Sequence, residues 1–406
     1  MENQMKKIIV LFVGVVLFST LQVIAEDPPN YIGQQSQNTI TTAVPFLMIG
    51  PDATSGGMGE VGGATAPDAN SMHWNPAKYA FIDSDMGFAV SYSPWLRKLV
   101  NDINLAYLTG FKRIDDKSTV SGSLKFFSLG DITFTDIQGE TIGNYRPNEF
   151  SVDGNYARKF SDRFSGAVSA RFIYSNLTQG QFVQGTATKP GTSIATDIAV
   201  YHTQPLSING LKSANLDWGI NISNIGSKIS YSNDDQAKDF IPTNFRLGLS
   251  MGIDIDDYNT FRFSFDLNKL LVPTPPIYAL DDDGNPVLDD NGDRVIYKGK
   301  NPNVSVMQGM IQSWYDAPGG FSEEMKEFVW VVGLEYWYDK QFAVRAGYFN
   351  ESTMKGGRQF FTLGAGLRYN VFGLDFSYLI PTEQQNPLQN TLRFTLTFNF
   401  AGVDNQ

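Results

Sequence analysis

Few side chains in this sequence could perform catalysis. The chain has no cysteine, and its only imidazoles are His73 and His202. The lack of cysteine excludes a thiol nucleophile, a disulfide framework and the usual structural zinc sites. A serine hydrolase needs a histidine near its nucleophile, which stands on a strand-to-helix elbow. We expect no such elbow. We also expect His73 to pack beside Trp74 and His202 to begin a periplasmic link outside the strands, so we predict that the chain is not an enzyme.

Two further motifs could bind a nucleotide or a cation. Gly57 to Gly62 match the spacing G-x-G-x-x-G, but no strand precedes them, so we predict no nucleotide site. The segment from Asp281 to Asp293 is rich in acidic and turn-forming residues. A calcium loop needs glycine after its alternating ligands, and Pro286 stands there, which favours a pair of hairpin turns. The sequence therefore predicts no metal and no cofactor.

Charge and hydropathy limit the possible partners. The 406-residue chain has a formal net charge of -11, whereas a nucleic-acid partner would need a basic face. Only 42% of the residues are hydrophobic. Beyond the extreme N-terminus, no stretch approaches the roughly 20 apolar residues of a spanning helix. We predict no nucleic-acid partner and no helical membrane domain.

Residues 1–25 are typical of an export signal. Lys6 and Lys7 form a positive region, a short apolar run follows, and Ala25 precedes the expected cleavage site. An N-terminal membrane anchor is the alternative, although the apolar run is short for a span. We predict that the mature chain is exported.

Alternating apolar residues indicate the class of fold. Between Thr391 and Phe400 every second residue is apolar, and polar residues stand between them. The same period of two recurs along the chain, which is typical of strands with one apolar face. We count 119–137 as one strand interrupted near Gly130, where glycine permits a bulge. The fourteen expected strands are 86–95, 101–111, 119–137, 149–158, 164–176, 192–201, 214–223, 243–254, 259–268, 327–338, 341–350, 359–369, 371–380 and 391–400.

Two architectures contain such strands. A soluble sandwich buries the apolar face, whereas an outer-membrane barrel turns it toward lipid. The polar positions are small or charged, as a crowded lumen requires, and ten residues tilted near 40° rise about 26 Å, which matches the apolar band. We predict an all-β, fourteen-stranded antiparallel transmembrane barrel over residues 86–400 in the cell outer membrane. Its outer links are long, 269–326 above all, its periplasmic turns are short, and 401–406 form a C-terminal tail.

Residues 26–85 precede the first expected strand and lack the alternation. A barrel of fourteen strands is wide enough to leak unless its lumen is filled. The segment is rich in glycine and other small residues, so we predict an N-terminal hatch that plugs the lumen. A flexible periplasmic tail is the alternative.

A family resemblance appears in the same segment. Residues Gly57 to Ile82, with the motif Trp74-Asn75-Pro76-Ala77, resemble the hatch of the PorV (LptO) family. These proteins are FadL-like outer-membrane barrels of the type IX secretion system. The resemblance covers essentially the whole mature chain. It implies that Trp74, Asn75, Pro76 and Ala77 form the hatch motif and that the third strand is kinked inward.

The resemblance also implies partners. Members of this family bind the giant translocon barrel, accept the C-terminal signal domains of cargo, and deliver cargo to a surface attachment complex with a PorU-like, sortase-like peptidase. Membrane lipid surrounds the wall. We therefore expect a non-enzymatic component of protein secretion. The rival hypothesis is a FadL-type transporter of long-chain fatty acids or other hydrophobic compounds.

Charged residues at the polar strand positions are predicted to face the lumen. Their mixed signs favour a network that holds the hatch, because a charge inside a barrel needs a partner. A substrate passage is the alternative. The predicted set is Lys125, Arg171, Arg246, Arg262, Arg345, Arg368, Arg393, Asp197, Asp217, Asp266, Glu335 and Asp375.

The long link 269–326 contains an apolar stripe at helical spacing. We predict either that it packs over the barrel mouth or that it forms a docking surface for a partner barrel or cargo. The residues of this predicted partner-docking loop are Met307, Met310, Ile311, Trp314 and Tyr315.

Overall fold

The computed structural model describes residues 37–400, apart from 99, 101, 136–138, 179, 181, 184–185, 233–237 and 384–385. The expected export signal 1–25 and the expected tail 401–406 lie outside these residues, as do 26–36 of the expected hatch. Among the described helices, none is long and apolar enough to cross a membrane.

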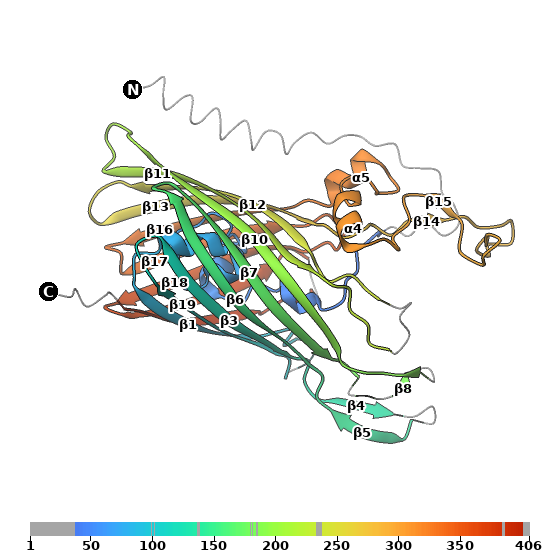
Figure 1. Cartoon of the computed structure of the whole chain (residues 1–406). Coiled ribbons are helices and arrows are strands. Elements are labelled where there is room, and N and C mark those ends of the chain that lie inside the picture. Colours follow the sequence, from blue (N-terminus) through green and yellow to red (C-terminus); the bar gives the residue numbers. More distant parts are fainter. Residues whose placement is uncertain are drawn as a thin grey trace.

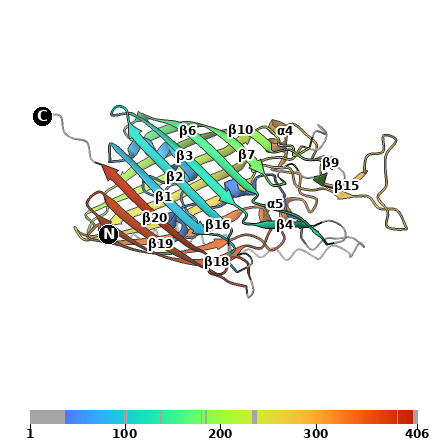
Figure 2. The same cartoon turned by 90° about the horizontal axis from the view of Figure 1, so that it is seen from below.

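Fourteen antiparallel strands form one closed barrel, in which β1 pairs with β20 (Figure 1). The predicted fourteen-stranded antiparallel barrel is confirmed. Figure 2 shows that the strands that form the barrel wall are strongly tilted. The strands are β1 (Met86–Pro94), β2 (Asn104–Arg113), β3 (Ser118–Ser128), β6 (Asn148–Ser161), β7 (Phe164–Asn176), β10 (Gly191–Leu206), β11 (Ser213–Gly226), β12 (Asn244–Asp254), β13 (Asn259–Leu270), β16 (Val329–Tyr338), β17 (Phe342–Asn350), β18 (Gln359–Tyr369), β19 (Phe372–Pro381) and β20 (Leu392–Phe400).

The apolar face of the wall points outward. On β20, Phe394 and Leu396 are exposed, whereas Arg393 and Thr395, which alternate with them, are 1% and 0% exposed. The same strict alternation of exposed and buried residues runs along β1 and β19. Successive side chains of a strand point to opposite faces, so one face meets lipid and the other lines the lumen.

The two ends of the barrel differ in the length of their links. One end has only short turns, such as 162–163 and 370–371, and its longest link is 207–212. The other end carries long links, the longest being 271–328 (Figure 1). Outer-membrane barrels have short periplasmic turns and long outer loops, so the long-link end is the outer end.

The outer links contain short elements of their own. Two small helices, α4 (Val306–Gln312) and α5 (Phe321–Lys326), lie in the longest link. Three two-stranded sheets accompany them, made of β4 (Ile132–Thr135) with β5 (Thr141–Tyr145), β8 (Phe182–Val183) with β9 (Thr186–Ala187), and β14 (Ile277–Tyr278) with β15 (Ile296–Lys298).

The expectation that 119–137 form one strand is wrong. Strand β3 ends at Ser128, and the chain then leaves the wall to form the separate β4–β5 sheet. Gly130 turns the chain with a positive φ of 79°, and the next amide, of Asp131, donates to the Asp102 carboxylate at 2.7 Å. Because β3 pairs with both neighbours without a register shift, the inward kink implied by the family resemblance is not found in this ladder.

The placement of His202 outside the strands is also wrong. Strand β10 continues to Leu206, which leaves only 207–212 as a link. The His202 ring stacks on the Trp218 ring, with their centroids 5.5 Å apart, and its centroid is 6.4 Å from that of Phe164. A band of aromatic rings at the membrane interface is typical of outer-membrane barrels. His202 joins such rings although it is not apolar, so the apolar alternation ends before the strand does.

Residues 37–85, called here the lumen segment, pack against the inward face of the wall. The segment contains η2 (Pro45–Met48), α2 (Ala53–Gly56), α3 (Ser71–Trp74) and η3 (Pro76–Phe81), drawn in blue among the strands of Figure 1. Its backbone touches wall glycines. A Cβ added at Gly347 would lie 2.1 Å from the Gly59 nitrogen, and one at Gly248 would lie 2.6 Å from the Ala64 nitrogen.

We predict that Gly347→Ala displaces the lumen segment, because backbone occupies the space that the methyl group needs. Overpacking of this kind costs about 1–3 kcal/mol. Hydrogen exchange at residues 57–64 should speed up and the thermal midpoint should fall. Gly154→Ala is the control, since a Cβ there meets nothing within 4 Å. Unchanged exchange in Gly347→Ala would contradict the contact.

Candidate functional site

The motif Trp74-Asn75-Pro76-Ala77 is fully buried against the wall. The Asn75 side chain caps η3 by accepting from the Ala77 amide at 3.0 Å, and its own amide donates to the carbonyls of Gly63 at 2.9 Å and Val200 at 3.0 Å. Proline is favoured at the first helical position, where no amide is needed. Asn75 therefore joins the start of η3, the glycine-rich turn and strand β10.

Trp74 connects a second part of the segment. Its indole N–H donates to the Asp52 carboxylate at 2.6 Å, and its carbonyl accepts from Asn221 on β11 at 3.1 Å. The Arg246 guanidinium lies over the indole ring, 4.8 Å from its centroid. The motif thus makes polar contacts with three adjacent strands of the wall.

The predicted lumen charges lie on the inward face, where most of them form ion pairs between strands. Arg345 pairs with Glu335 at 2.7 Å and with Asp375 at 2.8 Å, and Arg368 pairs with the same Asp375 at 2.7 Å. A second group lies elsewhere in the wall, where Arg262 pairs with Asp217 at 3.0 Å. Buried charges of this kind are tolerated because each has an opposite charge beside it.

Three of the predicted cations also hold the lumen segment. Arg246 pairs with Asp266 at 2.8 Å, and that carboxylate accepts the amides of Gly62 and Gly63 at 2.9 Å each. Lys125 donates to the carbonyls of Leu47 and Ile49. Arg393 pairs with Glu60. The network therefore ties the segment to β3, β12, β13 and β20.

Sequence reasoning missed some members of this network. Arg171 pairs with the predicted Asp197 at 3.0 Å and also with Asp153, which was not predicted. Asp153 stands between outward-facing Val152 and Gly154 on β6, so the alternation itself could have identified it. Glu60 lies outside the strands, where no alternation exists to indicate its direction.

The predicted docking loop forms α4 and the turn that follows it. Met307, Ile311, Trp314 and Tyr315 are exposed, and Met310 is half-buried. Ser305 caps the helix, and the opposite side of α4 has Gly309 buried against Phe240. Sequence reasoning missed Phe321 and Met325 of α5, which are 78% and 46% exposed.

Trp314 places this surface on the outside of the wall. Its ring lies edge-on to Phe245 with centroids 5.6 Å apart. Phe245 alternates with the buried, inward-facing Asn244 and Arg246 on β12, so it points outward near the outer end of the barrel. The exposed apolar side chains of α4 and α5 are therefore beside the rim, where lipid and aqueous exterior meet. We call Met307, Ile311, Trp314, Phe321 and Met325 the rim patch.

A buried lysine–glutamate cluster fixes α5 to the barrel. Lys269 at the end of β13 pairs with Glu324 and Glu327, and Lys355 pairs with Glu327 and Glu323. These five side chains are at most 7% exposed. The cluster gives the loop a defined position in spite of its length.

Asp316 lies beside this cluster and accepts the Thr274 amide at 3.2 Å. Burial raises the pKa of Asp316 to about 6, and the nearby Glu324 and Glu327 add to the rise. Because the folded-state pKa is raised, protonation below about pH 6 stabilises this part of the loop, and the benefit is lost as the pH rises through that value.

Two sequence motifs have structural explanations. Gly248 to Gly252 do match the spacing G-x-S-x-G, but they lie within β12, and Ser250 is hydrogen-bonded to Ser264 at 2.9 Å. No strand-to-helix elbow occurs there. The stretch 281–293 forms two successive turns, closed by bridges between Leu280 and Pro286 and between Leu288 and Arg294. Among the described residues, no His, Asp or Glu group could hold a metal ion.

We predict that Asp375→Ala destabilises the barrel, since it leaves Arg345 and Arg368 without a shared partner. Removing one member of a buried ion pair costs about 3–5 kcal/mol. The loss of stability is measured by urea unfolding, with heat-modifiable migration on gels as the readout of the folded fraction. The control is Asp257→Ala, which breaks an exposed pair with Lys212 and should change little. Equal midpoints for both variants would show that the lumen network does not contribute.

Several solved structures of other proteins are similar to this chain. Among solved structures, the chain is similar to the Pseudomonas putida toluene transporter TodX, with 10% identity and a TM-score of 0.49 over 89% of this chain and 98% of that one. It is also similar to a Pseudomonas aeruginosa FadL homologue, with 12% identity and a TM-score of 0.45 over 90% and 100% of the two chains. No curated protein sequence matches.

Family membership comes from the sequence itself. Residues 32–277, more than half of the chain, match the family described as type IX secretion system protein PorV. The matched part includes the lumen segment and the wall from β1 to β13. The resemblance noted in the sequence is thus confirmed, and the chain belongs to the PorV family of outer-membrane barrels of the type IX secretion system.

Proposed function

We propose that this chain is a non-enzymatic adaptor of type IX secretion. In this proposal it binds the giant translocon barrel, receives the C-terminal signal domains of cargo, and passes cargo to a PorU-like, sortase-like attachment complex. Membership of the PorV family supports a place in this system. The observation that carries the binding role is the rim patch.

The rim patch has the properties of a protein-docking surface. Phe321, Ile311 and Met307 are 78%, 62% and 61% exposed. They come from two helices of one link, and the lysine–glutamate cluster holds one of these helices, α5, against the barrel. Exposed apolar patches on fixed elements are typical of interaction sites, and large side chains supply most of their binding energy. Its position beside the outer rim favours a partner in the same membrane, such as the translocon barrel.

The lumen segment is proposed to act as a hatch that stays in place. Support comes from the glycine contacts, the Asn75 bonds to Gly63 and Val200, and the ion pairs that reach it from several strands. We further propose that residues 1–25 are an export signal removed from the mature chain.

The rival proposal, a FadL-type transporter of hydrophobic compounds, fits the interior less well. A hydrophobic compound would have to pass Arg345, Asp375 and Arg393, which are at most 3% exposed and locked in ion pairs. Opening such a path requires buried charges to lose their partners, which is costly.

The adaptor proposal predicts that Ile311→Asp and Phe321→Asp strongly weaken docking while the barrel still folds. Loss of an interface anchor costs about 2 kcal/mol or more, so co-purification with the translocon in mild detergent should fall about thirtyfold. Cargo should then accumulate unprocessed in the periplasm. Leu288→Asp is the matched control, because Leu288 is an apolar residue of the same link that is 57% exposed and lies outside the patch.

Normal export by both rim-patch variants would contradict the proposal. Deletion of 277–320 separates it from the rival. The adaptor proposal predicts blocked cargo export with unchanged uptake of hydrophobic compounds, and the transporter proposal predicts the reverse.

A further inference from the structure

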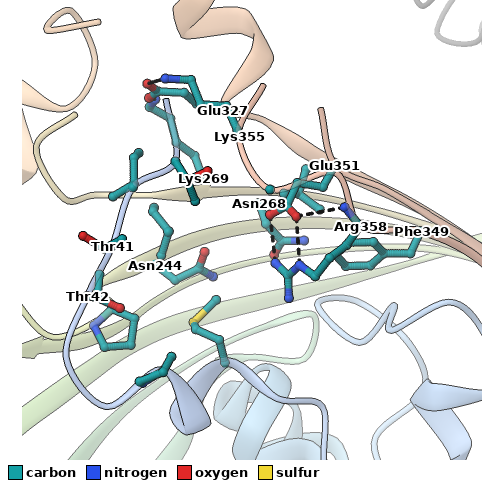
Figure 3. Close-up of a pocket in the computed structure, with 18 of the residues that line it drawn as sticks. Thr41, Thr42, Asn244, Asn268, Lys269, Glu327, Phe349, Glu351, Lys355 and Arg358 are labelled. Atoms are coloured by element: carbon teal, nitrogen blue, oxygen red, sulfur yellow. Dashed lines mark hydrogen bonds and ion pairs between the residues drawn. The ribbon is translucent and has the colours of Figure 1, made fainter. Parts of the chain in front are cut away.

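A cavity of about 430 Å³ lies at the outer end of the lumen, between the start of the lumen segment and the wall (Figure 3). Apolar side chains make up much of its lining, among them Ile40, Met48, Leu270, Val329 and Phe349. Ligand pockets are typically 300–1,000 Å³, mostly apolar, with a few placed polar groups. The size and lining therefore fit a small ligand or a short segment of chain.

Two amide side chains in this cavity have no hydrogen-bond partner among the residues that the structure describes. Asn244 and Asn268 are 3% and 7% exposed, and both line the cavity. The buried Asn268 Oδ1 has no hydrogen-bond partner, and neither side-chain amide is bonded to any residue that the structure describes. Buried polar groups are nearly always bonded in native proteins, so an unbonded pair facing a cavity indicates a missing partner.

The opposite side of the cavity is an unpaired stretch of backbone. The amide of Asn38 donates to the Met354 carbonyl at 2.8 Å, and that of Ala43 donates to the Phe240 carbonyl at 2.9 Å. Between them, the backbone of residues 39–42 makes no hydrogen bond to the described part of the chain. Exposure alternates between exposed and half-buried along 37–42, as in an extended strand. Such an edge can accept another strand.

The charges around the cavity disfavour an anionic ligand. Arg358 is held by both carboxylate oxygens of Glu351, at 2.8 and 2.9 Å, and Lys269 and Lys355 belong to the lysine–glutamate cluster. Figure 3 shows the Glu351–Arg358 pair across the cavity from Thr41 and Thr42. A fatty-acid carboxylate would have to displace a bound carboxylate, whereas a neutral amide would not.

We infer that this cavity binds an extended peptide segment with uncharged side chains. The peptide backbone pairs with residues 39–42, the Asn244 and Asn268 amides bond to its remaining peptide groups, and its apolar side chains fill the space beside Phe349 and Leu270. At about 3.4 Å per residue, roughly four residues run alongside the edge. This mode is strand addition, in which backbone bonds supply the affinity. The inference is independent of the rim patch.

The test is direct binding to the purified full-length chain in detergent. The probe is the acetylated and amidated peptide Thr-Val-Thr-Val-Thr, carrying a fluorophore and followed by anisotropy. Asn244→Leu and Asn268→Leu should each weaken binding about fivefold to tenfold, because each removes an amide of similar size. Thr41→Pro, which removes a backbone donor, should weaken it as much, while Thr41→Val should bind like the unaltered chain. Heat-modifiable migration checks that every variant folds.

Competition separates a peptide from an amphiphile. Unlabelled peptide should displace the probe, and dodecanoate should not. Stronger displacement by dodecanoate, no binding of the probe, or an affinity of Asn268→Leu or Thr41→Pro equal to that of the unaltered chain would each overturn the inference. Because the assay uses only the purified chain, its failure leaves the rim-patch proposal standing, and failed translocon docking leaves this one standing.

Discussion

The structure depends on the direction in which each strand residue points. A single arginine or lysine facing the middle of the bilayer costs about 2–4 kcal/mol, so the charged half of every strand must point inward. Inside, the charges need partners, and the wall supplies them as pairs between strands, such as Arg345 with Glu335 and Asp375. The ion-pair network therefore follows from the cost of exposing charged side chains to lipid. It also explains why a hydrophobic passage is poorly suited to this interior.

The lumen segment depends on that interior. Glycines on both sides allow its backbone to touch the wall, and the carboxylate of Asp266 accepts two of its amides, those of Gly62 and Gly63. At the outer end, the lysine–glutamate cluster extends the same principle to α5, since Lys269 at the end of β13 pairs with two glutamates near the far end of the link that follows this strand. The α5 part of the rim patch is thus fixed by buried charges, and its apolar side chains are exposed.

Much of the fold could be predicted from the sequence, because a period of two is a local signal that each strand carries by itself. The errors occurred where that signal ends. His202 belongs to an interfacial aromatic band, and Gly130 turns the chain out of the wall into a separate sheet. Contacts between distant links have no local signal at all, so the pairing of Lys355 with Glu323 and Glu327 could not be anticipated. The cavity beside residues 39–42 is likewise a product of tertiary packing.

Because the chain has no cysteine, single-cysteine labelling can test the direction of the side chains without a background. A bimane label at Leu396→Cys on β20 should be quenched strongly by brominated lipid, whereas a label at the neighbouring Thr395→Cys should be quenched little. That alternation is the result expected for an apolar face turned to lipid and a charged face enclosing the lumen segment. Equal quenching at both positions, or stronger quenching at Thr395→Cys, would contradict the account.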